Sequence, residues 1–177
     1  TMALCKITAI VGPNLPGHSE AIFDDVSLTT SPVVATATPL PPGSPEPPVR
    51  PAPVPFDAVA LRDNMSQVEY VLNQMGGLLD RLIRGSWETC QEYEGYYSQL
   101  MTSATYHSLP DEWNGIYNEY IFAVENATSR NNGVFSLCQN GGGSLTSQSY
   151  GDARSSIADS LDRLIPAVQQ ANALLGG

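Results

Sequence analysis

Long apolar segments are missing from this sequence of 177 residues. A membrane-spanning helix needs about 20 consecutive apolar residues, whereas the longest candidate, residues 3–11, is short and is interrupted by Lys6. The same segment lacks the basic flank of a signal peptide. We therefore expect no membrane span, and we interpret the chain as mature or as a fragment of a longer secreted protein.

Basic residues are also scarce, since one lysine and seven arginines stand against 18 acidic residues and give a formal net charge of −10. The negative charge is spread thinly, with neither an acidic tail nor a basic patch. Such a surface repels phosphate backbones and anionic lipid. We expect no nucleic-acid partner and no electrostatic docking on a membrane.

Histidine occurs only as His18 and His107, and neither completes the Glu-x-x-His pattern of di-metal helix bundles. The glycines at 141–143 follow no strand and lack the lysine of a phosphate-binding loop. Carboxylates one turn apart, such as Glu88 and Glu92, could act as acid and base, but exposed glutamates are ordinary on helices. We expect no enzyme, no metal and no cofactor.

Three cysteines suggest one disulfide bond. Cys90 and Cys138 flank the middle of the helical region, where a bridge would stabilise the fold by about 4 kcal/mol in the chain-entropy model. The alternative is a pair of buried free thiols in a cytosolic protein. Cys5 is left over, either buried among strands or paired outside this chain. Because disulfides persist in oxidising compartments, the predicted localisation is extracellular or at the cell surface.

Proline is concentrated in residues 31–55, which hold ten of the fourteen prolines. Proline fixes φ and keeps the preceding residue extended, so this segment predicts a polyproline-II-like spacer of about 3 Å per residue. A ligand for a proline-reading domain is the alternative. The domain organisation predicted is a strand segment over 1–30, the linker over 31–55, and a helical domain over 56–177.

Two strand-like runs, residues 4–11 and 21–28, lie on either side of a turn-rich stretch at 12–17. Within the second run, Ile22-Phe23-Asp24-Asp25-Val26-Ser27-Leu28 resembles the closing strand of galactose-binding-like jelly-roll modules, a carbohydrate-binding family of secreted bacterial proteins. The resemblance implies a partial β-sandwich. It implies no binding residue, because the earlier strands and most sugar-binding loops of that family are not in this chain.

Two strands alone are marginal, and their open edges are templates for pairing. We expect residues 1–30 to complete a sheet with a protein partner, with other copies in self-assembly, or with an upstream region of the same polypeptide. The linker adds a reach of up to ~75 Å.

The clearest helical pattern begins at Asp57, a good N-cap residue. Seven apolar residues follow at alternating spacings of four and three, as in a helix packed into a bundle. They are Leu61, Met65, Val68, Leu72, Met75, Leu79 and Leu82. Gly85 ends this helix. Gly76 and Gly77 lie in its middle, where they indicate either a closely approaching neighbour or a bend.

Three more helices are predicted. The second is capped by Ser86 and extends to about residue 104, and the third opens at residues 108–112 and ends near Arg130. Residues 131–146 are predicted to form a loop, and the fourth helix begins near Ser147 and is kinked by Pro166.

Short connections between these helices predict antiparallel neighbours. The predicted fold class is mainly α, an up-down-up-down four-helix bundle preceded by a proline-rich linker and two N-terminal β-strands. Two phrases, Tyr117-Asn118-Glu119-Tyr120 and Leu164-Ile165-Pro166-Ala167-Val168, make residues 57–175 similar to an uncharacterised helical domain at the C-termini of secreted bacterial proteins. That resemblance implies a location and no activity.

Aromatic residues are dense in the second and third helices. Most of them suit the core, but Tyr96 and Phe122 fall off the buried seams. Exposed aromatics with few charges are typical of contact surfaces, so Tyr96 and Phe122 are candidates for an interaction surface toward another subunit or a glycan. The alternative is a broad core stripe whose hydroxyls reach water.

The function predicted from these features is a non-catalytic extracellular structural or interaction module. The alternative is an appendage of a carbohydrate-binding secreted protein, in which the bundle is only a spacer.

Overall fold

The computed structural model describes residues 49–176. The strand runs predicted within 1–30, Cys5 and most of the proline-rich linker lie outside this range. The described elements are four α-helices, one 3-10 turn and two short strands. They are β1 (Val54–Pro55), α1 (Ala58–Leu82), η1 (Trp87–Thr89), α2 (Cys90–Met101), β2 (Tyr106–His107), α3 (Asp111–Gln139) and α4 (Ser147–Gly176).

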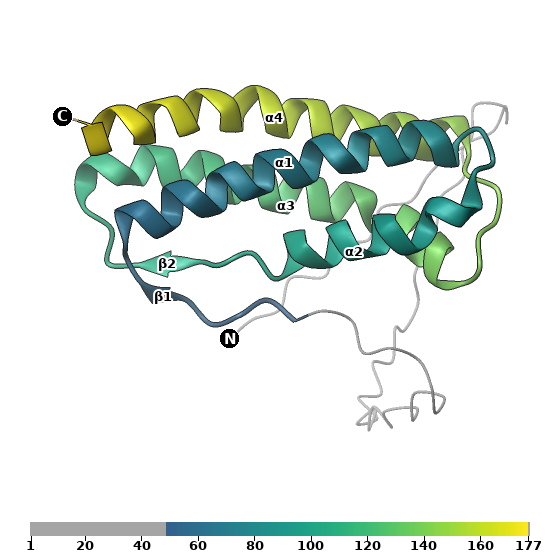
Figure 1. Cartoon of the computed structure of the whole chain (residues 1–177), viewed down its shortest axis with the longest axis horizontal. Coiled ribbons are helices and arrows are strands. Elements are labelled where there is room, and N and C mark those ends of the chain that lie inside the picture. The colour runs from purple at the N-terminus through teal and green to yellow at the C-terminus, as the bar shows by residue number, and fades with distance from the viewer. Residues whose placement is uncertain (1–48, 177) are drawn as a thin grey trace, which may run out of the picture. The chain divides into compact units, whose positions relative to one another are not determined.

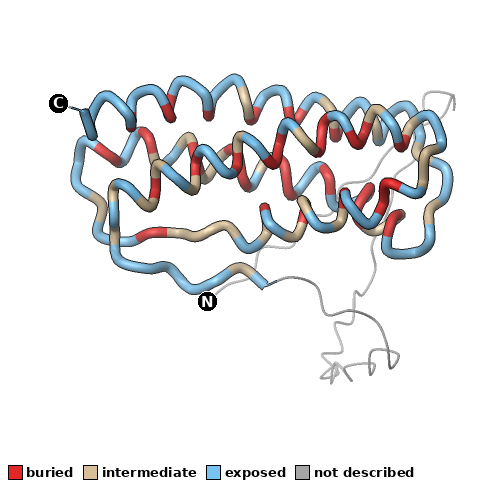
Figure 2. The backbone as a smooth tube through the Cα atoms, in the orientation of Figure 1, coloured by how far each residue is buried: buried red, intermediate tan, exposed pale blue. Residues whose placement is uncertain are grey.

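The four helices form an up-down-up-down bundle, as predicted (Figure 1). Each helix packs against the next along the chain, and α4 packs back against α1. The buried positions lie on the inward sides of the helices, and the outward sides are exposed (Figure 2).

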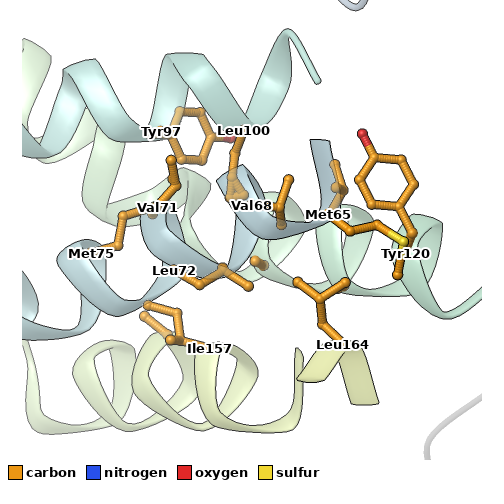
Figure 3. Close-up of a cluster of buried hydrophobic side chains, with 14 of the residues drawn as sticks. Met65, Val68, Val71, Leu72, Met75, Tyr97, Leu100, Tyr120, Ile157 and Leu164 are labelled. Carbon is orange, nitrogen blue, oxygen red and sulfur yellow. The ribbon is translucent and has the colours of Figure 1, made fainter. Parts of the chain in front are cut away.

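The predicted seam of α1 is the centre of the core, because all seven of its residues are at most 3 % exposed. Figure 3 shows four of them, Met65, Val68, Leu72 and Met75, between α2 and α4. The same core includes Tyr97, Leu100, Tyr120, Ile157 and Leu164 from the other helices. The predicted N-cap is confirmed, since Asp57 Oδ1 accepts a hydrogen bond of 2.9 Å from the backbone N–H of Ala60.

The two glycines in the middle of α1 have different surroundings. Gly76 is buried against α4, where an added Cβ would lie 3.3 Å from Nη1 of Arg154 and 3.8 Å from Cγ2 of Ile157. Gly77 is exposed, and a Cβ there would meet nothing within 4 Å. Close approach of a neighbouring helix therefore explains Gly76 and does not explain Gly77.

The end predicted for the third helix is wrong. Helix α3 does not stop near Arg130 but continues through Asn131 to Gln139, so the predicted loop at 131–146 is reduced to its last residues. The buried face continues from Asn131 through three residues one helical turn apart or less: Val134, Phe135 and Cys138. Packing on this face outweighs the local turn preference of the Asn-Asn-Gly sequence.

The second helix is shorter than predicted. It begins with the 3-10 turn η1, Ser86 provides no side-chain cap, and α2 ends at Met101. Beyond α2, the chain continues as an extended segment that contains β2 and runs beside the remaining length of the bundle (Figure 1). Tyr106 in this segment is 6 % exposed and belongs to the core.

The end of the predicted linker is part of the bundle. Residues 49–56, here called the strap, contain β1, which pairs in parallel with β2. The backbone N–H of Val54 donates to the carbonyl of Thr105 at 2.9 Å, and that of Phe56 donates to His107 at 3.1 Å. Nearer the N-terminal end of the strap, Arg50 forms an ion pair of 3.2 Å with Glu125 of α3. The strap is extended, as proline predicts, but it is attached to the helices and is not a free spacer.

Helix α4 begins at Ser147, as predicted, and Thr146 caps it by accepting a hydrogen bond of 3.0 Å from the backbone N–H of Ser149. Pro166 lies inside α4, and the helix continues past it to Gly176.

Candidate functional site

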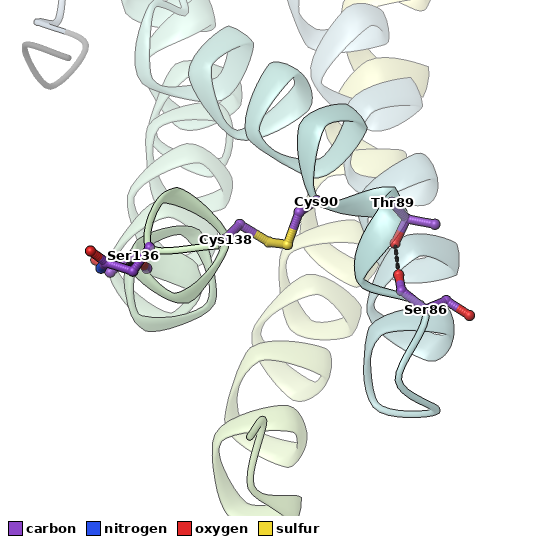
Figure 4. Close-up of a disulfide and its surroundings, with 6 residues drawn as sticks. Ser86, Thr89, Cys90, Ser136 and Cys138 are labelled. Atoms are coloured by element: carbon purple, nitrogen blue, oxygen red, sulfur yellow. Dashed lines mark hydrogen bonds between the residues drawn. A yellow bond between two sulfur atoms is a disulfide. The ribbon is translucent and has the colours of Figure 1, made fainter. Parts of the chain in front are cut away.

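A disulfide joins the start of α2 to the last turn of α3 (Figure 4). The sulfur atoms of Cys90 and Cys138 are 2.05 Å apart and their Cα atoms 5.1 Å apart, which is the pairing that the sequence predicts. Both residues are buried, at 9 % and 4 % exposure. Nearby, Gly142 has a φ of +93°, and a Cβ there would lie 3.0 Å from the ring of Trp87, so the loop after α3 packs closely on η1.

A buried polar layer crosses the bundle next to this disulfide. Tyr93 of α2 donates a hydrogen bond of 2.6 Å to Oδ1 of Asn131 on α3. The amide nitrogen of Asn131 donates to Oγ of Ser156 on α4 at 3.1 Å and to the carbonyl of Ala127 at 2.9 Å. Tyr93 and Asn131 are both 0 % exposed. This layer joins three helices and fixes their positions relative to one another along the bundle axis.

Burial alters the ionisation of the core tyrosines. It raises the pKa of Tyr93 well above its ordinary value, and the neighbouring Tyr97 adds to this effect. Burial also raises the pKa of Tyr97, Tyr106 and Tyr120. These phenols remain protonated hydrogen-bond donors over the whole neutral range.

Charged side chains on the outside of the bundle link pairs of helices. Asp80 of α1 accepts a hydrogen bond of 2.8 Å from Tyr150 and lies 3.4 Å from Nε of Arg154, both on α4. Arg163 of α4 holds both carboxylate oxygens of Glu119 on α3, at 3.0 Å and 2.6 Å. These carboxylates are engaged in helix-to-helix contacts.

The structure does not bring Tyr96 and Phe122 together. Phe122 lies on α3, where the guanidinium of Arg163 covers its ring with Cζ 3.9 Å from the ring centroid. Tyr96 lies on α2 and meets Tyr70 of α1. The two candidates therefore belong to different helix pairs, and only Tyr96 has an aromatic neighbour on the surface.

The surface around Tyr96 spans α1 and α2, and we call Gln67, Tyr70, Tyr96 and Gln99 the tyrosine face. The rings of Tyr70 and Tyr96 meet edge to face, with centroids 6.2 Å apart and hydroxyl oxygens 3.5 Å apart. Their hydrogen bond raises the pKa of Tyr96. Beside them, Nε2 of Gln67 lies 3.4 Å from Oε1 of Gln99. Tyr70 was not predicted from the sequence, although an aromatic residue off the α1 seam is a visible signal.

Hollows open on the sides of the bundle, among them two that include charged residues. One, of about 430 Å³, lies between α2 and α3 and includes Tyr97, Met101 and Asn132, with Arg50 of the strap at its edge. The other, of about 190 Å³, lies between α3 and α4 and includes Arg130 and Asp152.

Residues 49–176 bear on two features that the sequence predicts to be absent, a metal site and a membrane span. Among residues 49–176, the His, Cys, Asp and Glu side chains nowhere gather in groups of three that could hold a metal ion. His107 lies in β2, is exposed, and contacts the hydroxyl of Ser108 at 3.0 Å. No helix in this part of the chain is both long enough and apolar enough to cross a membrane.

The fold defines an antiparallel four-helix bundle with one internal disulfide. In comparison with known proteins, the chain matches no family model, no curated sequence and no solved structure. The two family resemblances drawn from the sequence therefore stay hypotheses, and functional inference depends on the side chains themselves.

Proposed function

We propose that this chain is a non-catalytic extracellular structural and interaction module, in which the bundle is the rigid part. The observation that carries the proposal is the use of its polar side chains. Asn131, Asp80 and Glu119 each connect helices to one another. Such cross-connections favour a single, stiff arrangement of helices, as a scaffold requires.

The proposed location is supported by the disulfide. Bonds of this kind form and persist in secreted proteins and at cell surfaces, and they are rare in the reducing cytosol. The bridge between Cys90 and Cys138 closes a loop with a sequence separation of 48 residues, so its formation removes much of the freedom of the unfolded chain.

The proposed interactions have two sources. Residues 1–30, through their predicted strand edges, would pair with a protein partner, with an upstream region or with other copies of the chain. The tyrosine face of the bundle offers a second contact. The alternative function, an appendage of a carbohydrate-binding protein, depends on the resemblance in residues 22–28, which lie outside the described range.

Association through residues 1–30 is testable by light scattering on the full chain. If other copies supply the missing strands, the full chain will form oligomers or filaments, and Val26→Pro will reduce them because proline removes a donor from the predicted strand. Thr30→Pro, just beyond that strand, is the matched control and should leave association unchanged. A monomeric full chain would contradict association between copies and would favour the upstream-region alternative.

The non-catalytic assignment has a separate test. The full chain is incubated with chromogenic esters, glycosides and peptides, and product is measured over hours. Turnover that disappears in Glu92→Gln or Glu119→Gln would contradict the assignment. Absence of turnover above that of a heat-denatured sample is the expected result.

A further inference from the structure

We propose that the tyrosine face binds a neutral glycan, with one sugar ring seated beside Tyr96 and a second over Tyr70. This inference rests on the proposed function as an interaction module and names the ligand class of one of its contacts.

The rings supply the apolar part of such a site. Tyr70 is 51 % exposed, and Tyr96 is half-buried and packs against the core. A pyranose ring has an apolar face of C–H groups that packs well on an aromatic ring, and its hydroxyls need partners at the ring margin. Tyrosine combines both properties, because its ring is apolar and its tip is polar.

The polar groups on this face are suited to hydroxyls. The amides of Gln67 and Gln99 are both exposed and are joined by one long contact of 3.4 Å, which leaves them further donors and acceptors. Asn73, one turn from Tyr70, is exposed and uses its amide nitrogen on the carbonyl of Glu69 at 2.9 Å. Amides and phenols each both donate and accept, as sugar hydroxyls do.

The charge of the face favours a neutral ligand. Glu92 lines the pocket beside Tyr96 and lies 3.8 Å from Arg81, so these two charges offset one another. An anionic polymer would meet Glu92 without a free cation beside it. A protein interface of standard size has an apolar core, whereas the exposed positions of α1 next to Tyr70 on this face are Gln67 and Asn73.

The surface between Tyr96 and Gln99 is hollowed. An open pocket of about 260 Å³ is lined by Glu92, Gly95, Tyr96 and Gln99. Gly95 contributes no side chain to this lining, and a Cβ added there would meet nothing within 4 Å. Glycine at an exposed helical position is less stabilising than alanine, and here it keeps open the space beside the Tyr96 ring.

The test is isothermal titration of the full chain with neutral hexaoses of glucose, xylose, mannose and N-acetylglucosamine, and with hexagalacturonate as the acidic comparison. We expect at least one neutral hexaose to bind and hexagalacturonate to bind at least tenfold more weakly. Tyr70→Ala should weaken binding about fivefold to tenfold, because one exposed ring is lost. Gly95→Gln should abolish binding while leaving the helical circular dichroism intact, because glutamine is the better helix former.

Gly115→Gln is the matched control, because Gly115 is an exposed glycine of α3 with nothing within 4 Å of an added Cβ. It should bind like the unmodified chain. Absence of binding to every neutral hexaose would overturn the proposal, and so would binding that survives Gly95→Gln, which would place the sugar elsewhere on the chain. Preference for hexagalacturonate would also overturn it. Cleavage of a bound hexaose would instead contradict the non-catalytic function and leave the location of the site standing.

Discussion

Replacing the two partners of the buried Tyr93–Asn131 hydrogen bond, singly and together, tests whether the polar layer sets the stability of the bundle. Tyr93→Phe removes the hydroxyl that donates to Asn131 at 2.6 Å. Asn131→Leu replaces the amide by an apolar side chain of similar size. Because both residues are 0 % exposed, water does not reach the group that each single change leaves behind.

The magnitudes follow from which polar atoms lose their partners. Tyr93→Phe leaves Oδ1 of Asn131 unpaired, which costs about 1–3 kcal/mol. Asn131→Leu leaves the Tyr93 hydroxyl unpaired at a similar cost of about 1–3 kcal/mol, while Ser156 keeps its own bond of 2.8 Å to the carbonyl of Ala153. In the double variant neither atom is left unpaired, so its cost should fall short of the sum of the single costs by both penalties, about 2–6 kcal/mol.

The assay is urea unfolding of the full chain at pH 7, followed by circular dichroism at the helical band. Tyr150→Phe is the control, because it removes the same atom from a bond to Asp80 on the surface, where both residues are partly exposed. It should cost under about 1 kcal/mol, since water replaces the lost partner. Strict additivity in the double variant, or equal costs for Tyr93→Phe and Tyr150→Phe, would refute the reasoning.

Three further predictions concern the covalent bridge, pH and the paired glycines. Replacing Cys90 and Cys138 together by alanine should lower stability by about 4 kcal/mol, measured as a lower urea midpoint than in the oxidised chain. Burial holds the pKa of Tyr93 and Tyr120 above the unfolded value of 10.0, so the folded state keeps protons that the unfolded state releases. The contribution of these tyrosines to the free energy of unfolding is therefore full below pH 10 and should fall above it by up to about 1.4 kcal/mol per pH unit for each of them. Thermal melts between pH 8 and pH 11 would show this fall. Gly77→Ala should raise stability by about 1 kcal/mol, whereas Gly76→Ala should gain less because its Cβ meets Arg154 at 3.3 Å.

Each of these predictions has an outcome that would contradict it. Equal urea midpoints for the oxidised and cysteine-free chains would show that the bridge adds nothing to stability. A melting temperature that stays constant up to pH 11 would contradict the effect of burial on the tyrosines. Equal gains at positions 76 and 77 would show that the contact with α4 imposes no constraint.

The first helix could be predicted from sequence because its signal is local and repeated. Seven apolar residues at spacings of four and three are compatible only with an amphipathic helix, and Asp57 marks where this helix begins. The disulfide could be predicted because only two cysteines lie in the helical region. In both cases the information is contained in the spacing along the chain.

The features that sequence analysis missed depend on partners far away along the chain. Asn131 looked like the start of a turn, but its amide is satisfied by Tyr93, 38 residues earlier, and by Ser156, 25 residues later. Likewise, Val54 pairs with Tyr106 in strands of two residues each, too short for alternation to appear. Only half of the aromatic pair in the tyrosine face was predicted, because Tyr96 was recognised as a surface candidate and its partner Tyr70 was not.

The attachment of the strap has a mechanical consequence. Tension that enters through Val49 meets the Arg50–Glu125 ion pair and then the backbone bonds of Val54 and Phe56 before it reaches α1. We expect these contacts to break before the helices separate. Their loss would release roughly 25 Å of extended chain while the four helices stay packed. If the bundle itself unfolds under tension, the disulfide transmits the force directly from Cys90 to Cys138. Most of α2 and α3 lies between these two residues and would therefore bear no tension.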